Sequence, residues 1–520
     1  MEGTIFSIIP PLLMLILVIL TRRILISLGA GIIVGALFIH DFHIIETLKE
    51  IWLVFYEIFV SDGAINLGNI YLLVFLILLG MMTAFLQASG GSRAFGEWMM
   101  KRVKTRAGAQ LMTGVLGIII FIDDYFTSLA VGQIARPVTD RHRVSRVKLA
   151  YLIDSSAAPV TVMSPISSWG AYIIGLLGGL FATYGITEFT PLEAFIKTIP
   201  YNFYAIAAVL LVFLVAWLQI DVGSMRIHEK RAIEKGQVLD PNQKNIPGDL
   251  GDEINAHQGG KVYHLFLPIM VLFIVTVLAM IVTGAMASEG DINIFTIFEN
   301  TDVNLSLFIG GLAAVIVSLF FHLGQSKPKE STGKILVEGT KTMLPAIYIL
   351  VLAWMIGSII GKLETGTYLA GLVEQISIDA SFLPLLFFII AGFMALSTGT
   401  SWGTFGIMLP IGVEVMIIAD PSLLLATLAA VLAGAVFGDH CSPISDTTIL
   451  SSTGAGSNMM DHVITQLPYA FIAAGTAIVG YLVIALTNHL WIALIISFIV
   501  LVGTSLIIRT ATLRKVNRES

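Results

Sequence analysis

Two polar stretches interrupt otherwise apolar parts of the chain. The first, GDHCSPISDTT (438–448), places Asp439 and Asp446 around His440, a proline and several hydroxyls. The second, DSSAAPVTVMSPISS (154–168), combines Asp154 with the same types of residue. Carboxylates and hydroxyls together provide an all-oxygen site, which suits a hard cation such as Na⁺. Both stretches therefore predict ion-binding chemistry.

Two further carboxylates, Asp123 and Asp124, lie in the short polar segment IDDYFTS. Ionisable groups inside a membrane are costly, and they are generally functional. Burial disfavours a charged carboxylate and a nearby cation favours it, so such a group can hold a proton or a metal ion but not both favourably. That competition is the minimal physics of cation/proton exchange, and it requires no covalent chemistry.

Each candidate also has a purely structural alternative. Asp123 or Asp124 could simply cap the helix that follows, and the sequence does not distinguish the two. Asp154 and Asp446 could likewise begin helical segments. His440 either bonds a carbonyl group or acts as a proton sensor.

The single cysteine, Cys441, excludes an internal disulfide, and packing explains it best. No resident cofactor is expected, because Na⁺ and H⁺ would be the transported ions.

The composition defines the elements that must position these groups. The mean hydropathy of the 520-residue chain is +0.89, with 56% hydrophobic and 12% charged residues. Apolar runs of about 20 residues match the thickness of a bilayer crossed by a helix. The runs are continuous rather than alternating, which argues against a β-barrel. The sequence therefore predicts an all-α polytopic membrane protein.

We expect about 11 transmembrane spans and two re-entrant hairpins with inverted-topology repeats and broken helices. The spans are predicted at 5–20, 24–40, 70–89, 149–184, 201–219, 263–286, 305–322, 343–361, 422–452, 466–486 and 490–508. The hairpins are predicted at 109–135 and 382–418, where short apolar limbs flank polar turns. A limb of about 12 residues covers only roughly 18 Å and cannot cross.

The distribution of basic residues supports this topology. With an external N-terminus, all but three of the 29 Lys and Arg residues fall on cytoplasmic segments, the exceptions being Lys49, Lys197 and Lys362. The C-terminus is then cytoplasmic. One hairpin enters from each side, so the two units have opposite orientation.

Two long spans, 149–184 and 422–452, should unwind near their middles, where proline removes a backbone donor. A shift of 284 residues aligns Pro159 with Pro443, and a shift of 273 aligns Thr127 with Thr400. These matches predict an internal repeat, which is the architecture of secondary transporters. The two hairpin tips and the two unwound regions should converge at one place.

The predicted organisation has six parts. They are peripheral N-terminal helices (1–69), repeat 1 (70–220), a cytoplasmic linker (221–262), connecting helices (263–322), repeat 2 (343–486), and a terminal helix with a cytoplasmic tail (487–520). The charged linker reads as a solvated loop rather than a domain.

The motifs resemble a known family. GDHCSPISDTT with the following LSSTGAGSNMMDHVITQLPYA, and FIDDYFTSLAVGQIARPVTDRHRVSRVKLAYLIDSSAAPVTVMSPISSWGAYI, are similar to the signatures of the NhaC family of sodium/proton antiporters. The resemblance covers roughly residues 70–485. It implies a transporter of the bacterial inner membrane with hairpins and broken helices, for which homodimers are common. The family also includes exchangers of small organic acids and amino-acid carriers.

The residues and the resemblance together give one set of candidates for ion or substrate binding. They are Asp123, Asp124, Thr127, Asp154, Ser155, Thr398, Thr400, Ser401, Asp439, His440, Ser442, Ser445, Asp446 and Thr447. Within this set, Na⁺ is assigned to Asp439, Ser442, Asp446 and Asp124.

The main hypothesis is a Na⁺/H⁺ antiporter that contacts membrane lipid. No nucleic-acid partner is expected. The alternative is a Na⁺- or H⁺-coupled carrier of a small carboxylate or amino acid. The alternative of an intramembrane aspartyl protease that uses Asp439 does not explain the duplicated hairpins. A channel would not need inverted broken helices.

Overall fold

The computed structural model describes most of the chain, and most of the residues left out fall within 242–255, 289–292 and 366–378. The residues described are 2–21, 23–61, 63–121, 123–165, 167–241, 243, 246, 254, 256–288, 293–326, 328–365, 367–368, 371 and 379–519. Nearly all of these residues are helical, because a backbone inside lipid must satisfy its own hydrogen bonds. The chain is an all-α polytopic membrane protein, as predicted.

The apolar helices were counted by length and hydropathy within the described ranges. Nine are long and apolar enough to cross a membrane, or ten if one bent pair counts as a span. Four predicted spans do not pass this test alone: 149–184 is broken into helices of 16 and 17 residues, 201–219 passes only as part of the bent pair, and the segments at 5–20 and 24–40 form short helices. These are α1 (Ile9–Thr21) and α2 (Ile24–Ile39), with 13 and 16 residues. Both limbs of the second hairpin pass the length test.

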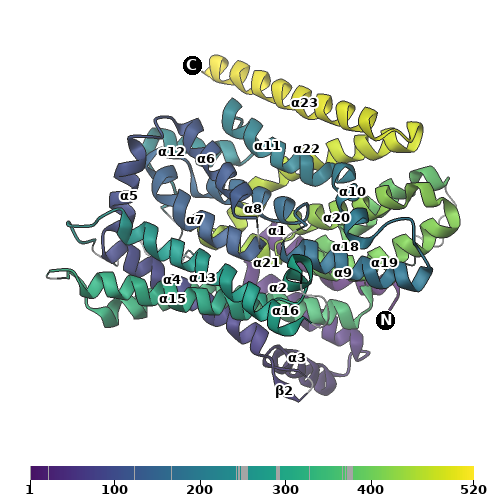
Figure 1. The fold of residues 1–520 in the computed structure, drawn as a ribbon, viewed down its shortest axis with the longest axis horizontal. Coiled ribbons are helices and arrows are strands. Elements are labelled where there is room, and N and C mark those ends of the chain that lie inside the picture. Colours follow the sequence, from purple (N-terminus) through teal and green to yellow (C-terminus); the bar gives the residue numbers. More distant parts are fainter. Residues whose placement is uncertain are drawn as a thin grey trace.

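Two helical hairpins and two broken helices form the centre of the molecule (Figure 1). The first hairpin consists of α6 (Arg106–Ile119) and α7 (Asp124–Arg141), and the second of α18 (Leu383–Thr398) and α19 (Ser401–Ala419). The first broken helix consists of α8 (Arg146–Thr161) and α9 (Ser168–Tyr184), and the second of α20 (Leu424–Cys441) and α21 (Asp446–Ala455).

The breaks show a different repeat register from the one predicted. Pro159 lies inside α8, and the first break falls at residues 162–167, around Pro165. This break aligns with residues 440–445 through the identical tetrapeptide Ser-Pro-Ile-Ser at 164–167 and 442–445. Ser167 and Ser445 both cap the helix that follows. The structural register is therefore 278 residues at the breaks, and not 284.

The hairpin tips follow nearly the same register. Asp123 precedes α7 and Thr400 precedes α19 as the N-cap residues, which are 277 positions apart. One turn later, Thr127 and Thr404 each donate a hydrogen bond to the carbonyl of the corresponding N-cap residue. The predicted pairing of Thr127 with Thr400 at a shift of 273 is therefore wrong by four residues, or one helical turn.

Other helices surround this centre. They are η1 (Ile5–Ile8), α3 (Ile44–Phe59), α4 (Leu67–Ala88), α5 (Gly91–Met100), α10 (Pro191–Thr198), η2 (Ile199–Tyr201), α11 (Phe203–Leu218), α12 (Met225–Lys235), α13 (Tyr263–Ala287), α14 (Ile294–Glu299), α15 (Val303–Leu323), α16 (Thr332–Lys362), η3 (Ala380–Phe382), η4 (Pro421–Leu423), α22 (Met459–Thr487) and α23 (Leu490–Glu519). A two-residue hairpin pairs β1 (Val60–Ser61) with β2 (Ala64–Ile65). Helices α4, α13 and α15 lie side by side at one edge, while α23 packs on α22 at the opposite edge (Figure 1).

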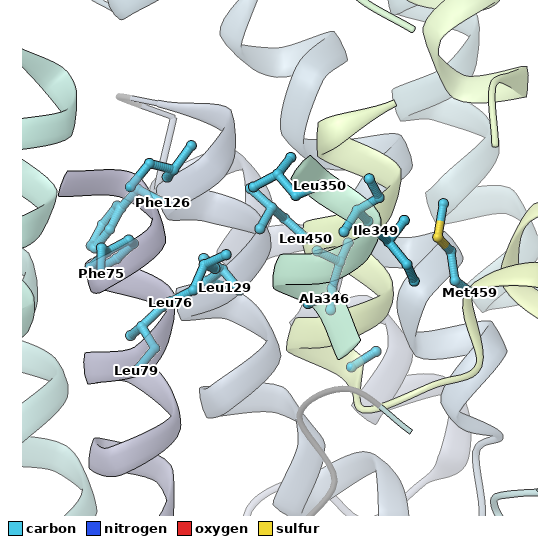
Figure 2. Packing of buried hydrophobic residues seen from close by; sticks show 14 of the residues in the cluster. Phe75, Leu76, Leu79, Phe126, Leu129, Ala346, Ile349, Leu350, Leu450 and Met459 are labelled. Atoms are coloured by element: carbon cyan, nitrogen blue, oxygen red, sulfur yellow. The ribbon is translucent and has the colours of Figure 1, made fainter. Parts of the chain in front are cut away.

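The hydrophobic core lies where these helices pack against one another. Figure 2 shows Phe75 and Leu76 of α4 beside Phe126 and Leu129 of α7, with Leu350 of α16 near Leu450 of α21. Glycines bring helix backbones close elsewhere: a Cβ on Gly132 of α7 would meet the backbone of Gly454 of α21 at 2.5 Å. Small residues at helix crossings are typical of packing in lipid, where close backbone contact replaces the hydrophobic effect.

The linker is more ordered than a solvated loop. Its helix α12 places Glu229, only 1% exposed, against the starts of α6 and α8. The Glu229 carboxylate forms an ion pair with Arg106 and accepts a hydrogen bond from the Ser145 backbone N–H at 2.7 Å. The first part of the linker is thus fixed to the helical body, whereas positions 242, 244–245, 247–253 and 255 lie outside the described residues.

Candidate functional site

The two hairpin tips and the two broken helices converge. At the first tip, Asp123 accepts a hydrogen bond from the Ser168 hydroxyl at 2.8 Å, which joins α7 to the start of α9. At the second tip, a Cβ on Gly399 would meet the Ile444 side chain at 2.6 Å. Ser442 donates to the Leu396 carbonyl at 2.9 Å and so attaches the second break to α18.

Contacts between the repeats complete the convergence. Tyr125, next to Asp124, donates a hydrogen bond to the Asp446 carboxylate in the first turn of α21. The Trp169 ring of α9 packs edge-on against Trp402 of α19, with 5.7 Å between ring centroids. Residues more than 200 positions apart in the sequence are therefore in contact at this junction.

The adjacent aspartates Asp123 and Asp124 have different roles. Both carboxylate oxygens of Asp123 have a hydrogen-bond donor. Oδ1 caps α7 by accepting from the Phe126 N–H at 3.0 Å, and Oδ2 accepts from the Ser168 hydroxyl. Asp124 accepts from Trp169 Nε1 at 2.9 Å through Oδ1, while its Oδ2 is buried without a hydrogen-bond partner. The structural alternative of capping thus applies to Asp123, and Asp124 is left with a free oxygen.

Asp439 lies at the end of α20, beside the second break. Its Oδ2 accepts a hydrogen bond from Thr447 at 3.3 Å, and its Oδ1 is buried without a partner. Thr447 also bonds the Ser445 hydroxyl at 2.8 Å, so the first turn of α21 holds one face of the carboxylate. Asp446 accepts from the Thr447 N–H at 2.9 Å as well as from Tyr125.

At the tip of the second hairpin, Ser401 approaches the Asp439 carboxylate. Ser401 is 1% exposed, and its hydroxyl makes no hydrogen bond of regular geometry to a described residue, although it lies within weak hydrogen-bonding range of that carboxylate. Thr398 bonds the Met394 carbonyl of its own helix, and Thr400 makes no side-chain cap bond. Thr127 of the first tip likewise bonds carbonyls of its own hairpin, those of Asp123 and Ile120.

Three buried oxygens therefore remain unsatisfied at this junction: Asp124 Oδ2, Ser401 Oγ and Asp439 Oδ1. Asp124 is within electrostatic range of both Asp439 and Asp446. None of these carboxylates forms an ion pair with Lys or Arg in the described part of the chain. Buried charge without a partner is costly. The arrangement can lower that cost by binding a cation or a proton.

No group of three His, Cys, Asp or Glu side chains close enough to hold a metal ion occurs among the residues searched. A cation at the junction would therefore need hydroxyl or backbone oxygens in addition to carboxylates. A mixed oxygen shell of that kind suits a weakly held alkali ion better than a transition metal. Ser442 contributes by attaching the break to α18 through its hydroxyl.

Asp154 does not face the unsatisfied oxygens. It is completely buried and accepts hydrogen bonds from the side chains of Gln466, His462, Ser451 and Thr448, at distances of 2.6, 3.2, 3.2 and 3.4 Å. The neighbouring Ser155 is also buried, yet no described hydrogen bond joins its hydroxyl to either carboxylate cluster. Asp154 thus belongs to a second polar cluster, which is joined to α21 through Thr448 and Ser451.

His440 points away from the Asp439 carboxylate. Its Nδ1 lies 3.0 Å from the Tyr204 hydroxyl of α11, and its carbonyl accepts from Gln466 at 3.0 Å. Cys441 is buried and free.

The set of candidate site residues predicted from the sequence lacked eight residues of these networks: Tyr125, Ser168, Trp169, Tyr204, Thr448, Ser451, His462 and Gln466. His462 and Gln466 carried a usable signal, because polar residues at i and i+4 share one helix face.

The chain is similar in sequence to a known family and to several known proteins. Residues 160–486 match the model of the Na+/H+ antiporter family. An uncharacterized protein of Haemophilus influenzae is 49% identical over 490 residues, covering 94% of this chain and 92% of its own. The malate-2H(+)/Na(+)-lactate antiporter of Bacillus subtilis is 32% identical over 199 residues, or 36% of this chain and 40% of that protein.

Two more distant likenesses were found. An uncharacterized Na(+)/H(+) antiporter of Haemophilus influenzae is 37% identical over 152 residues, covering 27% of this chain and 30% of that protein. The solved structure of the Alcanivorax borkumensis YdaH transporter aligns over 88% of this chain and 90% of its own, with 14% identity and a TM-score of 0.35, which is too low to argue from.

The family match covers well over half of the chain, and it includes both polar breaks and the second hairpin. The duplicated hairpins and buried carboxylates are features of a transporter rather than an enzyme. The protein is a multi-pass, sodium-coupled antiporter, and it belongs to the Na+/H+ antiporter family.

Proposed function

We propose that the protein exports Na⁺ in exchange for protons across the bacterial inner membrane by alternating access. The observation that carries this proposal is the set of three unsatisfied oxygens, Asp124 Oδ2, Ser401 Oγ and Asp439 Oδ1. They come from the first hairpin, the second hairpin and a helix break, which are the elements that a transporter would move relative to one another.

The binding shell follows from the contacts. Asp124 and Asp439 each have one oxygen fixed by a donor and the other free, so each can offer a single directed ligand to a cation. Ser401 would add a neutral oxygen. Asp446, held by Tyr125 and the Thr447 N–H, would act mainly by its charge.

The backbone supports cation binding at the same place. The C-terminal end of α20 reaches the junction at Cys441, and the C-terminal end of α18 reaches it at Thr398. Carbonyl groups at helix C-termini carry partial negative charge, which favours a cation. The acidic residues Asp124 and Asp446 lie in the first turns of their helices and offset the positive ends there.

Protons and Na⁺ would compete for these carboxylates. A proton entering from outside neutralises a carboxylate and releases the cation, and loss of that proton to the cytoplasm allows Na⁺ to bind again. No covalent intermediate or resident cofactor is needed. The inward and outward states would differ in which hairpin seals the junction.

The test uses everted membrane vesicles from cells that lack other Na⁺/H⁺ antiporters. A ΔpH formed by respiration should collapse when Na⁺ is added to vesicles that contain the wild-type protein. Vesicles with Asp439→Asn at equal expression should show no collapse. A preserved Na⁺ response in Asp439→Asn would reject the site, and no response of the wild-type protein between about pH 6.5 and 9 would reject the function.

A second candidate function is exchange of a small carboxylate coupled to Na⁺ or H⁺. It is favoured by the match over 199 residues to a protein named as a malate-2H(+)/Na(+)-lactate antiporter. Thermal-shift measurements on the purified protein with organic acids and amino acids, each with and without Na⁺, separate the two. Stabilisation by an organic anion that depends on Na⁺ would favour the carrier.

A further inference from the structure

The cluster around Asp154 is separate from the proposed cation site and has its own unusual chemistry. Asp154 and His462 are both completely buried, with His462 Nε2 3.2 Å from Asp154 Oδ2. Gln466, one turn further along α22, donates to the same oxygen at 2.6 Å. The donors come from α21 and α22, so three helices enclose one carboxylate–imidazole pair.

Several polar atoms of the residues lining this cluster have no partner. These are His462 Nδ1, Gln466 Oε1, His440 Nε2 and the Tyr151 hydroxyl. Buried polar atoms in folded proteins are almost always hydrogen-bonded, so four exceptions around one carboxylate need an explanation. An imidazole with one nitrogen on a carboxylate and the other free is the arrangement that accepts and releases a proton.

Hydrogen bonds connect this cluster to the cation site. Thr448 donates its hydroxyl to Asp154 at 3.4 Å, and its N–H bonds Ser445 at 3.3 Å. Ser445 in turn bonds Thr447, the residue that holds Asp439. Gln466 also spans both sides, because it donates to Asp154 and to the carbonyl of His440. A change of charge at the pair can therefore alter the first turn of α21.

A second chain of hydroxyls leads to the first hairpin. Ser451 donates to Asp154 Oδ1 at 3.2 Å and lies 2.9 Å from the Ser128 hydroxyl of α7. The pair is thus in contact with both the hairpin and the broken helix that a transporter would move.

We infer that Asp154 and His462 form a proton-binding site distinct from the cation site at Asp124, Ser401 and Asp439. The inference rests on the proposed Na⁺/H⁺ exchange. One proton binds to the imidazole and converts a neutral histidine beside a carboxylate into an ion pair, and its release restores the net negative charge. This proton is additional to the one that competes with Na⁺ at the carboxylates, and the two sites communicate through the first turn of α21.

Other titratable groups surround the pair. Tyr151 lies on α8 with Asp154, Tyr204 on α11 bonds His440, and Cys441 follows His440 on α20. Asp439 lies beyond the first turn of α21, and Asp461 is held by Gln243 at 2.6 Å. In the part of the chain that is described, no Lys or Arg forms an ion pair with Asp154. Among these groups, the one in direct contact with the His462 ring is the Asp154 carboxylate.

The test compares two fluxes of the full-length protein in proteoliposomes. Sodium–sodium counterflow, followed with labelled Na⁺, requires only the cation site, whereas Na⁺-driven proton movement requires both sites. His462→Gln keeps a donor to Asp154 but cannot take up a proton. The matched control is His322→Gln, because His322 is buried on α15 with an unpartnered Nδ1, outside both clusters.

In His462→Gln, we expect the ratio of proton-coupled flux to counterflow to fall by about tenfold or more. The pH profile of the remaining flux should differ from that of the wild-type protein between about pH 5 and 8, where histidine titrates. His322→Gln should keep the wild-type ratio and pH profile. If His462→Gln does not assemble in the membrane, the near-isosteric Asp154→Asn is measured in the same way, with the same expected fall.

An unchanged ratio and pH profile in the variant would overturn the inference and leave the proposed function standing. Equal loss of both fluxes would also overturn it, because the pair would then belong to the cation site. Absence of both fluxes in the wild-type protein would instead reject the proposed function, and this inference with it.

Discussion

Trp169 Nε1 donates a hydrogen bond to Asp124 Oδ1 across 2.9 Å and so connects the start of α9 to the tip of the first hairpin. Both residues are about 1% exposed. The contact fixes one oxygen of Asp124 and leaves Oδ2 without a partner. A tryptophan at the start of the second half-helix thus orients the carboxylate that the proposed cation site uses.

Trp169→Phe should weaken Na⁺ binding because it removes this donor and leaves the ring volume largely filled. A hydrogen bond to a charged group contributes about 1.5–3 kcal/mol. If about half of that is expressed in Na⁺ binding, the KM for Na⁺ rises roughly 4- to 12-fold. The KM is measured from the Na⁺ dependence of ΔpH collapse in everted vesicles.

The matched control is Trp402→Phe, because Trp402 packs against Trp169 but makes no described hydrogen bond to an aspartate. Its KM should stay within about twofold of the wild-type value, the scale of a small packing change. Equal increases in both variants would show that the aromatic packing matters and the hydrogen bond does not.

The neighbours Asp123 and Asp124 should respond differently to the same substitution. Asp123→Asn retains a side-chain oxygen that can cap α7, and asparagine caps helices about as well as aspartate. Asp124→Asn replaces the charge whose Oδ2 is free for a cation. We expect Na⁺ efflux from proteoliposomes to be largely retained in the first variant and to fall by about 100-fold or more in the second. If Na⁺ efflux were instead lost in Asp123→Asn and retained in Asp124→Asn, Asp123 would be the residue at the cation site and Asp124 would have the structural role.

Much of the central architecture follows from polar residues placed in apolar surroundings. The hairpin turns and the broken helices were predicted because carboxylates, hydroxyls and prolines interrupt continuous apolar runs. The four sites of interruption could be found in this way because leaving such groups in lipid without partners is prohibitively unfavourable.

The register of the repeat was predicted less accurately than the positions of the hairpins and broken helices. Alignment of Pro159 with Pro443 assumed that proline marks the break, but α8 continues through Pro159 to Thr161. The break comes where a side chain can satisfy the freed backbone: Ser167 donates to the carbonyls of Thr161 and Ser164, at 2.8 and 2.7 Å. The equivalent prolines are therefore Pro165 and Pro443, and the serine two positions after each of them caps the following half-helix.

The role of Asp154 also could not be predicted from the sequence. Its partners His462 and Gln466 lie more than 300 positions away. They were assigned to a loop and to the start of a span predicted at 466–486, whereas α22 begins at Met459 with Asn458 as its N-cap. Seven additional helical residues bring His462 into the core. Composition alone cannot show this, because DHVIT is polar enough to be a loop.

Gly454→Ala should destabilise the protein by disturbing the contact between α21 and α7. A Cβ at this position would overlap the Ser128 carbonyl oxygen, a backbone atom that cannot move away independently. Overpacking of this kind costs about 1–3 kcal/mol. Thermal unfolding in detergent should therefore shift to a lower temperature. Because Ser128 bonds Ser451, transport should weaken as well.

The control is Gly475→Ala in α22, where no atom lies within 4 Å of the added Cβ. Alanine is favoured over glycine in a helix by about 1 kcal/mol, so this variant should be neutral or slightly stabilised. A Gly454→Ala protein as stable as the control would contradict the close packing of α7 on α21.

Glu229→Gln tests whether the linker has a structural role or is only a solvated loop. Glutamine keeps an oxygen for the Ser145 N–H but removes the negative charge opposite Arg106. Because Glu229 is 1% exposed, the loss of this charge should cost about 1–3 kcal/mol and lower the unfolding temperature. Glu234→Gln on the same helix is the matched control, since its pair with Lys230 is exposed and such pairs contribute about 0–1 kcal/mol. Similar unfolding temperatures for the two variants would mean that α12 does not hold the starts of α6 and α8 in place. A selective effect of Glu229→Gln would make the linker part of the scaffold on which the first hairpin is mounted.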